Sequence, residues 1–264
     1  SSKKIMGSIL NFCNKRRPHL QAEEARDFST MSADQTAMHQ DQTIPAEIKL
    51  YYDLYVPDDE QPHPLLVALH GYGANKRQMM REARELAPPG FAIASLQGFH
   101  QHIREPKEKG GPLRYGFGWV TNFHSEESIA LHHRALLDLI AKLTDHGAVD
   151  PRRIFLLGFS QSCALNYRFA FTYAERLRGV VGICGGLPGD WEASERYSQT
   201  RAAVLHLCGA RDEFYPPERV EDYGARLKER ARDVEVKSYD AGHEIVPRMR
   251  EDVRSWLRSH AQQP

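Results

Sequence analysis

Short apolar runs alternate with longer segments of helical periodicity from residue 48 to the end of the chain. Seven of these runs have the length and composition of β-strands: 48–56, 64–71, 91–97, 153–159, 179–185, 203–209 and 234–240. Between them, apolar residues recur every three or four positions, which is typical of amphipathic helices. Strands that alternate with helices favour a mostly parallel sheet with helices on both faces. The sequence therefore predicts an α/β fold.

Two helical segments have clear ends, and one long segment has no periodicity. Ser125 is the expected N-cap of a helix that ends before Gly147, and a second helix is expected at about 245–260. Residues 98–124 are rich in glycine and aromatic residues and fit neither a strand nor a helix. Loops of this length in compact domains are usually functional or mobile. We therefore expect this segment to form a wall or lid over a site.

Residues 1–45 differ in composition from the rest of the chain. A basic start is followed by a polar stretch with few aromatic residues, which predicts an extension with little fold of its own before one domain at 46–264. Gly7 and Cys13 beside a basic cluster hint at an acylated anchor. However, Asn11 stands where the myristoylation pattern has Ser or Thr. We therefore favour a leader segment over an anchor.

The charge balance narrows the class of partner. Thirty-five Lys and Arg residues balance thirty-five Asp and Glu residues in the 264-residue chain, so no net field draws the protein to nucleic acid or anionic lipid. Small neutral partners are the better expectation. The four cysteines lack the paired spacing of a metal site and favour a reducing compartment. No membrane span or secretory signal is visible, so we expect a cytoplasmic protein.

The pentapeptide GFSQS at 158–162 joins a predicted strand to a predicted helix. A serine at such a strand-to-helix turn is typical of a hydrolase nucleophile, usually written G-x-S-x-G, and Ser160 holds that place here. Ser162 replaces the final glycine. Because serine is among the smallest side chains, we expect a crowded but workable turn. A serine can also simply cap a helix at this junction, so Ser160 needs helpers before it qualifies as a nucleophile.

An acid and a histidine follow two other predicted strands. Asp212 lies just after the strand at 203–209, and His243 lies just after the strand at 234–240. Because the carboxyl ends of parallel strands meet at one edge of a sheet, all three side chains are expected there. Their chain order, Ser then acid then His, is the order of the α/β-hydrolases. The sequence therefore predicts a Ser160–His243–Asp212 triad.

Some alternatives compete with these residues. Glu213 and Asp240 are rival acids, although the shorter Asp212 is preferred to Glu213, and Asp240 fits the start of a turn better. The histidine pairs at 100/102 and 132/133 suggest a metal site. Neither pair has an acid at a recognisable spacing, so we expect no catalytic metal.

Donors for a developing oxyanion are expected at two places. HGYGA at 70–74 begins at the end of the strand at 64–71, and its glycines allow a tight turn that aims an N–H inward. The backbone N–H of Gln161 begins the helix after the nucleophile, where the helix dipole also favours negative charge. We assign the loop at 70–74 to orientation and oxyanion binding, with His70 as an orienting residue.

These motifs resemble the phospholipase/carboxylesterase family of α/β-hydrolases, which includes acyl-protein thioesterases. The likeness covers about residues 46–262: HGYGA resembles that family's HGxG segment, GFSQS its GFSQG motif, CGARDEFYPP its acid loop and AGHEI its histidine loop. The resemblance implies an α/β-hydrolase fold and ester or thioester hydrolysis through an acyl-enzyme, with no metal or organic cofactor. It also implies that the backbone N–H of Tyr72 joins that of Gln161 in the oxyanion hole.

The substrate expectation is less specific. The resemblance makes Trp119 similar to a tryptophan near the family's acyl pocket, and Gly71 and Phe214 are further candidate substrate contacts. We expect a serine carboxylesterase acting on short- to medium-chain carboxylic esters. An acyl-protein thioesterase or lysophospholipase, and a ligand-binding protein of the same fold without turnover, are the alternatives. A homodimer is left open.

Overall fold

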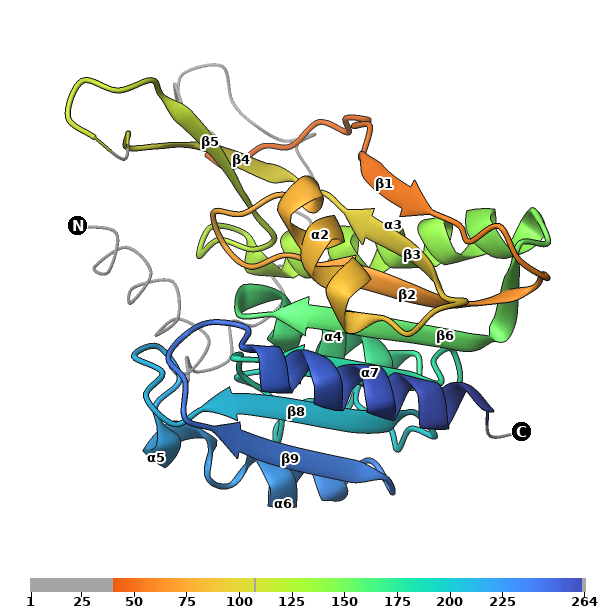
Figure 1. Ribbon diagram of the computed structural model, residues 1–264. Helices are drawn as coiled ribbons and strands as arrows, with labels where there is room; N and C mark the ends of the chain where they lie inside the picture. Colours follow the sequence, from red (N-terminus) through yellow and green to blue (C-terminus); the bar gives the residue numbers. More distant parts are fainter. Residues whose placement is uncertain (1–39, 107, 263–264) are drawn as a thin grey trace, which may run out of the picture.

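The computed structural model describes residues 40–106 and 108–262 and contains a seven-stranded sheet in the order β1-β3-β2-β6-β7-β8-β9 (Figure 1). These strands are β1 (Tyr52–Tyr55), β2 (His63–Leu69), β3 (Ala92–Leu96), β6 (Val149–Phe159), β7 (Gly179–Ile183), β8 (Ala203–Gly209) and β9 (Val234–Tyr239). Only the edge strand β1 runs antiparallel to its neighbour; every other pairing is parallel. The predicted α/β fold with a mostly parallel sheet is confirmed. Most of the predicted extension, including Cys13, lies outside the described residues.

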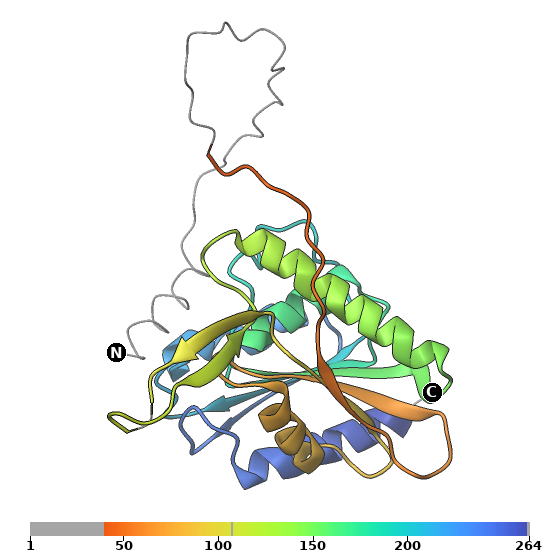
Figure 2. The same ribbon diagram turned by 90° about the horizontal axis from the view of Figure 1, so that it is seen from above.

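Helices cover both faces of the sheet. They are α2 (Lys76–Leu86), α3 (Ser125–Asp145), α4 (Gln161–Thr172), α5 (Pro217–Val220), α6 (Tyr223–Lys228) and α7 (Pro247–Gln262). Figure 2 shows α2 and α7 on one face and α3 and α4 on the other. Each face carries its own apolar core, and β2, β3, β7 and β8 are buried along their whole length. Strands buried on both faces explain the continuous apolar runs in the sequence.

The segment at 98–124 is not the irregular loop that its composition predicted. It contains a two-stranded antiparallel hairpin, β4 (His100–Arg104) and β5 (Arg114–Gly118), which projects from the edge of the molecule in Figure 1. Most positions in these strands are exposed or half-buried, so the apolar alternation that marks a strand is missing. Gly116 lies opposite His102, and a Cβ on Gly116 would stand 2.7 Å from His102 Nε2 and from Arg104 Cδ. The glycine therefore leaves room for the His102 and Arg104 side chains, which would have to shift if position 116 carried a Cβ.

The start of α3 also differs from the prediction. Ser125 is the first helical residue, and His124 holds the N-cap position with φ 47° and ψ 53° and no side-chain cap. The preceding turn is closed by Thr121 Oγ1, which contacts both the N–H and the C=O of Phe123. The chain therefore enters the helix one residue earlier than the N-cap pattern suggested.

The strand ends place the candidate residues together. β6, β8 and β9 are parallel, so Ser160, Asp212 and His243 follow strand ends at the same edge of the sheet. In the described part of the chain, no helix is long and apolar enough to span a bilayer.

Candidate active site

Ser160 sits in a backbone conformation that few non-glycine residues adopt. Its φ is 57° and its ψ is −115°, at the junction between β6 and α4. Its N–H donates to the carbonyl of Ile183 at 2.9 Å, and its own carbonyl accepts from Cys163 N at 3.1 Å. Such strained residues persist only where the surroundings hold them, and they cluster at functional sites. The turn therefore presents the Ser160 hydroxyl in one fixed direction.

Ser162 fits the turn and also bonds to it. Its hydroxyl donates to the carbonyl of Leu69 at 2.9 Å, contacts the carbonyl of Phe159 at 3.1 Å and accepts from Phe159 N at 3.0 Å. The side chain is fully buried, so these contacts satisfy a polar group that water does not reach. The hydroxyl thus ties the end of β2 to the end of β6, a contact that glycine does not provide. Position 158 of the pentapeptide leaves less space for a side chain than position 162, since a Cβ on Gly158 would lie 2.9 Å from Asn166 Nδ2.

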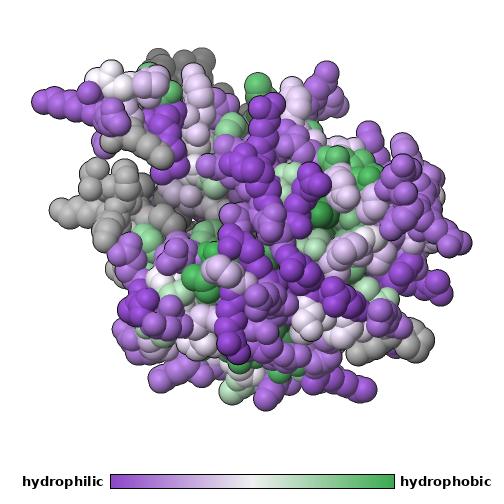
Figure 3. Space-filling model, viewed as in Figure 1, coloured by the Kyte–Doolittle hydropathy of each residue, from purple (hydrophilic) through white to green (hydrophobic). Residues whose placement is uncertain are grey.

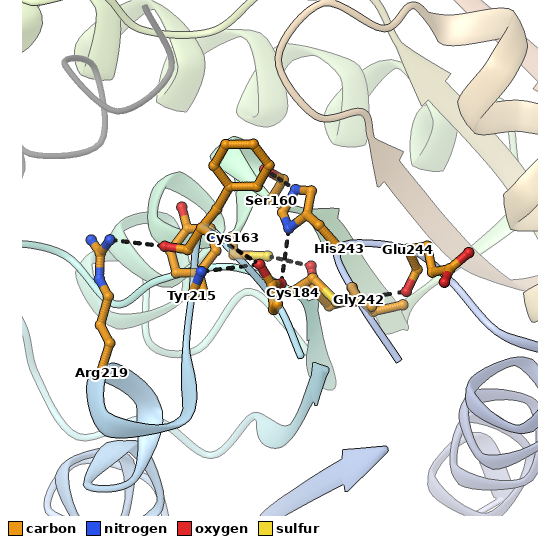
Figure 4. Close-up of polar contacts among 11 residues, drawn as sticks. Ser160, Cys163, Cys184, Tyr215, Arg219, Gly242, His243 and Glu244 are labelled. Atoms are coloured by element: carbon orange, nitrogen blue, oxygen red, sulfur yellow. Dashed lines mark hydrogen bonds and ion pairs between the residues drawn. The ribbon is translucent and has the colours of Figure 1, made fainter. Parts of the chain in front are cut away.

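His243 stands between Ser160 and Asp212. Its Nε2 lies 2.9 Å from Ser160 Oγ, and its Nδ1 lies 2.9 Å from Asp212 Oδ2. Figure 4 shows the imidazole beside Ser160 with a dashed contact on each side of the ring. Phe214 packs edge-on against the ring at 4.8 Å between centroids, and Phe159 packs at 5.0 Å. The three residues predicted from strand ends therefore form one hydrogen-bonded chain.

Asp212 is held by more than the histidine. Its Oδ1 accepts from the backbone N–H groups of Phe214 at 2.8 Å and Tyr215 at 3.0 Å. Burial alone raises the pKa of this carboxyl, but the hydrogen bonds from His243, Tyr215 and Phe214 outweigh it and leave the pKa below its usual value. Asp212 therefore stays ionised at neutral pH and can hold the imidazole with its Nδ1–H toward the acid.

One rival acid is placed elsewhere. Asp240 is exposed and pairs with Arg211, so its carboxylate is engaged away from His243. Glu213 follows Asp212 directly, yet the carboxylate in contact with His243 belongs to Asp212. The preference for Asp212 as the partner of the histidine agrees with the geometry.

The loop at 70–74 packs directly on the Ser160 turn. A Cβ on Gly71 would lie 3.0 Å from Phe159 Cδ1 and 3.2 Å from Ser160 Cβ, so a larger residue would require these neighbours to shift by a few tenths of an ångström. Within the described residues, the backbone N–H groups of Tyr72 and Gln161 donate no hydrogen bond. Neither N–H is engaged by another described acceptor, and their role as oxyanion donors stays a prediction.

His70 fixes the base of that loop. Its Nε2 accepts from Gly98 N at 3.0 Å and contacts Gln97 Nε2 at 3.1 Å, while its Nδ1 lies 2.8 Å from the carbonyl of Gly71. Burial lowers the pKa of His70 to about 4, so the ring is neutral at physiological pH. A neutral ring with its proton on Nδ1 donates to the Gly71 carbonyl, and the two donors share the single lone pair of Nε2. This arrangement agrees with the orienting role expected for His70.

Gln161 and Trp119 connect the turn to the hairpin side of the site. The Gln161 side chain accepts from Trp119 N at 2.9 Å and donates to the carbonyl of Val120 at 3.0 Å. The Trp119 indole donates to the carbonyl of His70 at 2.7 Å, and the side chain is fully buried. Trp119 thus offers no accessible surface to a substrate, and its contacts support a structural role. The motif pointed to Gln161 through its backbone, and nothing in the sequence indicated this side-chain contact.

The β4–β5 hairpin also forms hydrogen bonds with the loop at 70–74. Gly73 N donates to the carbonyl of Phe117 at 2.8 Å, and Arg104 Nη1 donates to the carbonyl of Gly73 at 2.9 Å. The Tyr72 ring stacks on His102 with 4.6 Å between centroids and 7° between planes. The segment at 98–124, which was expected to be a wall or lid, therefore packs against the loop at 70–74 and supports it. Sequence reasoning missed these residues because the contacts depend on an unrecognised strand pairing.

Three thiols lie beneath the site and are not rivals to Ser160. Cys163, Cys184 and Cys208 are buried and unpaired. Burial raises the pKa of Cys163 far above its usual value and raises the pKa of both Cys184 and Cys208 to about 12. These thiols stay protonated at neutral pH and are poor nucleophiles.

The histidine pairs do not converge on an acid. His100 contacts Ser128 at 2.9 Å, and the ring of the fully buried His132 packs against Trp119. The described residues hold no group of three His, Cys, Asp or Glu side chains that could bind a metal ion.

Comparisons with known proteins bear on both the sequence and the fold. Residues 53–261 match the family described as phospholipase/carboxylesterase. Among curated proteins, acyl-protein thioesterase 1 of Gibberella zeae is 31% identical over 229 residues, covering 78% of this chain and 94% of that protein.

Solved structures share the fold at lower identity. The carboxylesterase of Bacillus cereus superposes with a TM-score of 0.62 at 17% identity, covering 80% of this chain and 94% of the other. The structure of esterase PE8 gives a TM-score of 0.64 at 18% identity, covering 80% and 99% of the two chains. These likenesses show an α/β-hydrolase fold for the described domain.

Proposed function

Because this chain belongs to the phospholipase/carboxylesterase family of α/β-hydrolases, we propose that it is a serine carboxylesterase acting on short- to medium-chain carboxylic esters. The observation that carries the proposal is the continuous hydrogen-bonded chain Ser160–His243–Asp212, with both steps at 2.9 Å. Serine hydrolases are recognised by this geometry and by the roles that it permits.

In the first half of the reaction, His243 Nε2 takes the proton of Ser160 as Oγ attacks the ester carbonyl carbon. Asp212 accepts a hydrogen bond from the Nδ1–H of the imidazolium and stabilises the positive charge of that ring. The negative oxygen of the tetrahedral intermediate binds the N–H groups of Tyr72 and Gln161, the second at the N-terminus of α4. When the intermediate collapses, the C–O bond breaks, His243 returns the proton to the leaving alcohol, and the acyl group stays on Ser160.

In the second half, water replaces the alcohol. His243 removes a proton from water, hydroxide adds to the acyl carbon, and the same two N–H groups bind the oxyanion. Collapse returns the proton to Ser160 Oγ and releases the carboxylic acid. Every step uses side chains and backbone groups of the chain, so the proposal requires no cofactor.

An acyl-protein thioesterase is the second candidate. The curated relative at 31% identity is named acyl-protein thioesterase 1, which favours a thioester substrate. The two candidates share the same triad chemistry and differ in leaving group and acyl length. Ratios of kcat/KM for matched oxyesters and thioesters of two to sixteen carbons decide between them: a maximum at short oxyesters supports the carboxylesterase.

Labelling with a fluorophosphonate tests the nucleophile. We expect one phosphonylated residue, Ser160, identified by mass spectrometry of the digested protein. Ser160→Ala should abolish labelling and lower kcat by on the order of 10⁶ while the far-UV circular dichroism spectrum stays unchanged. Ser162→Ala is the matched control, because Ser162 lies two residues away and bonds only to backbone, and it should still be labelled.

Two results count against the proposal. Modification of another residue, or near-native turnover by Ser160→Ala, removes Ser160 from its role. A stoichiometric burst of p-nitrophenol from a p-nitrophenyl ester with no later turnover indicates instead a ligand-binding protein of the same fold.

The remaining parts of the proposal concern the wider molecule. Residues 46–264 form the catalytic domain, and the substrate is a small neutral ester. Gly71 and Phe214 line the acyl site; Phe214 is only half-buried and contacts His243, which supports its place. A reducing, cytoplasmic location is supported by the absence of a disulfide among the described cysteines.

A further inference from the structure

A cavity lies at the edge of the sheet opposite the candidate active site. It has a volume of about 490 Å³ and is lined by the end of α2, the start of β3, Tyr55 of β1 and two residues of α7. β3 is parallel to β6, so its first residues lie at the edge away from Ser160. In Figure 1 the C-terminal end of α7 lies on the right, whereas the arrowheads of β6 and β8 point left. The volume is within the range of small-molecule sites.

The walls of this cavity combine two kinds of surface. Its apolar part is formed by Tyr55, Ala87, Pro88, Pro89, Phe91 and Ile93. Its charged part consists of three arginines, Arg84, Arg254 and Arg258, with no carboxylate side chain in the lining. In Figure 3, hydrophilic residues cover most of the face that carries α2 and α7.

None of the three arginines forms an ion pair with a described carboxylate. The guanidinium of Arg84 lies 4.5 Å over the Tyr55 ring, and Arg254 donates to the backbone carbonyl of Glu85. Arg258 is exposed, and its side chain makes no hydrogen bond or ion pair to the described residues. By contrast, Arg250 on the same helix pairs with Glu82 at 2.7 Å. The cavity therefore concentrates three uncompensated positive charges in a protein with zero formal net charge.

One acid, Asp59, lies beside a lining residue of the cavity but forms no described ion pair with the three arginines. Asp59 Oδ2 lies 3.7 Å from the position that a Cβ on Gly90 would take, at the rim of the cavity. Its other oxygen pairs with His63 Nδ1 at 3.2 Å. The Asp59 carboxylate is thus directed to a histidine, and none of the three guanidinium groups is neutralised by an ion pair with it.

We propose that this cavity binds a small organic phosphate, with the phosphate held by Arg254 and Arg258 and a flat apolar body placed against Tyr55 and Pro89, the exposed apolar residues of the lining. Guanidinium groups match the paired oxygens of phosphate with two parallel hydrogen bonds and bind such anions more specifically than lysine does. The apolar wall selects a ligand with a ring or short chain over a bare ion. The proposal does not depend on the hydrolase activity, because no residue of the cavity belongs to the triad or to the loop at 70–74.

Calorimetric titration of the full chain with phenyl phosphate tests the site. We expect one saturable site per chain, with affinity reduced about tenfold by Arg258→Gln and by Arg254→Gln, since each removes a charge-assisted hydrogen bond. Arg77→Gln is the matched control: Arg77 is exposed on the first turn of α2, outside the cavity, and its removal changes the net charge equally. Inorganic phosphate should bind more weakly than phenyl phosphate.

A second arm separates the two sources of such a phosphate. Vesicles of phosphatidylcholine with a tenth phosphatidic acid carry the same phosphate group on a lipid. Sedimentation with these vesicles that is lost in Arg254→Gln and Arg258→Gln assigns the site to a lipid headgroup; binding of phenyl phosphate alone assigns it to a soluble ligand. Absence of saturable binding by both probes overturns the proposal, and so does an equal loss of affinity in Arg77→Gln.

Discussion

At the scale of single residues, Ser162 shows how a departure from a motif can be stabilising. Its hydroxyl satisfies Phe159 N and bonds to the carbonyl of Leu69, so a serine in the glycine position joins two strand ends beneath the nucleophile. The sequence indicated that a small side chain fits. It did not indicate the bonds, because Leu69 is 93 residues away along the chain.

Ser162→Ala should lower the free energy of unfolding by about 1–3 kcal/mol, because it leaves buried backbone groups without a partner. Its kcat should stay within a few-fold of the parent, since the backbone of the turn is kept. Urea denaturation measures the change. Ser255→Ala, at an exposed position of α7, is the control and should shift stability by less than about 0.5 kcal/mol. A loss no larger than that of the control contradicts the structural role of the hydroxyl.

At the scale of elements, the β4–β5 hairpin supports the loop at 70–74. Arg104 donates to the carbonyl of Gly73, and Gly73 N donates to Phe117 of the hairpin. The strand segments of the main sheet and the meeting of Ser160, Asp212 and His243 could be predicted from sequence, because parallel strands deliver their following residues to one edge. The hairpin could not, since its glycines and charged residues lack the period of a half-buried strand.

Arg104→Ala should lower kcat by about tenfold with little change in KM, because a loosened loop weakens an oxyanion contact made only in the transition state. Steady-state kinetics on a p-nitrophenyl ester gives both constants. Arg114→Ala is the matched control: Arg114 lies opposite Arg104 in the hairpin, and its side chain makes no described hydrogen bond or ion pair. Equal effects of the two substitutions indicate a general role in hairpin stability and contradict a positioning role for Arg104.

At the scale of the whole molecule, buried neutral histidines couple stability to pH. Burial lowers the pKa of His70, His133 and His206 to about 4, below the usual value of about 6.5. The unfolded chain therefore binds protons more readily than the folded chain between these values. The stability that the neutral rings contribute is fully present above pH 6.5 and is lost as the pH falls toward 4.

Between pH 7 and pH 5, each of these histidines should remove about 2 kcal/mol from the free energy of unfolding. Urea denaturation at the two values measures the total loss. His206→Gln should reduce that loss, because the fully buried ring that must be protonated is gone. His146→Gln, at an exposed position, should leave it unchanged. Stability that does not change across this interval contradicts the shifted pKa values.

The left-handed backbone of Ser160 has a thermodynamic cost that reverses an ordinary rule of substitution. A protein with glycine at a given helix or strand position is usually less stable than the same protein with alanine by about 0.5–1 kcal/mol, because glycine gives the unfolded chain more conformational freedom. At a φ of 57°, alanine carries the steric penalty and glycine does not. Both variants lack the hydroxyl, and Ser160→Gly should melt at a higher temperature than Ser160→Ala. The difference between their calorimetric midpoints measures the destabilisation that the Ser160 backbone conformation imposes on the folded protein.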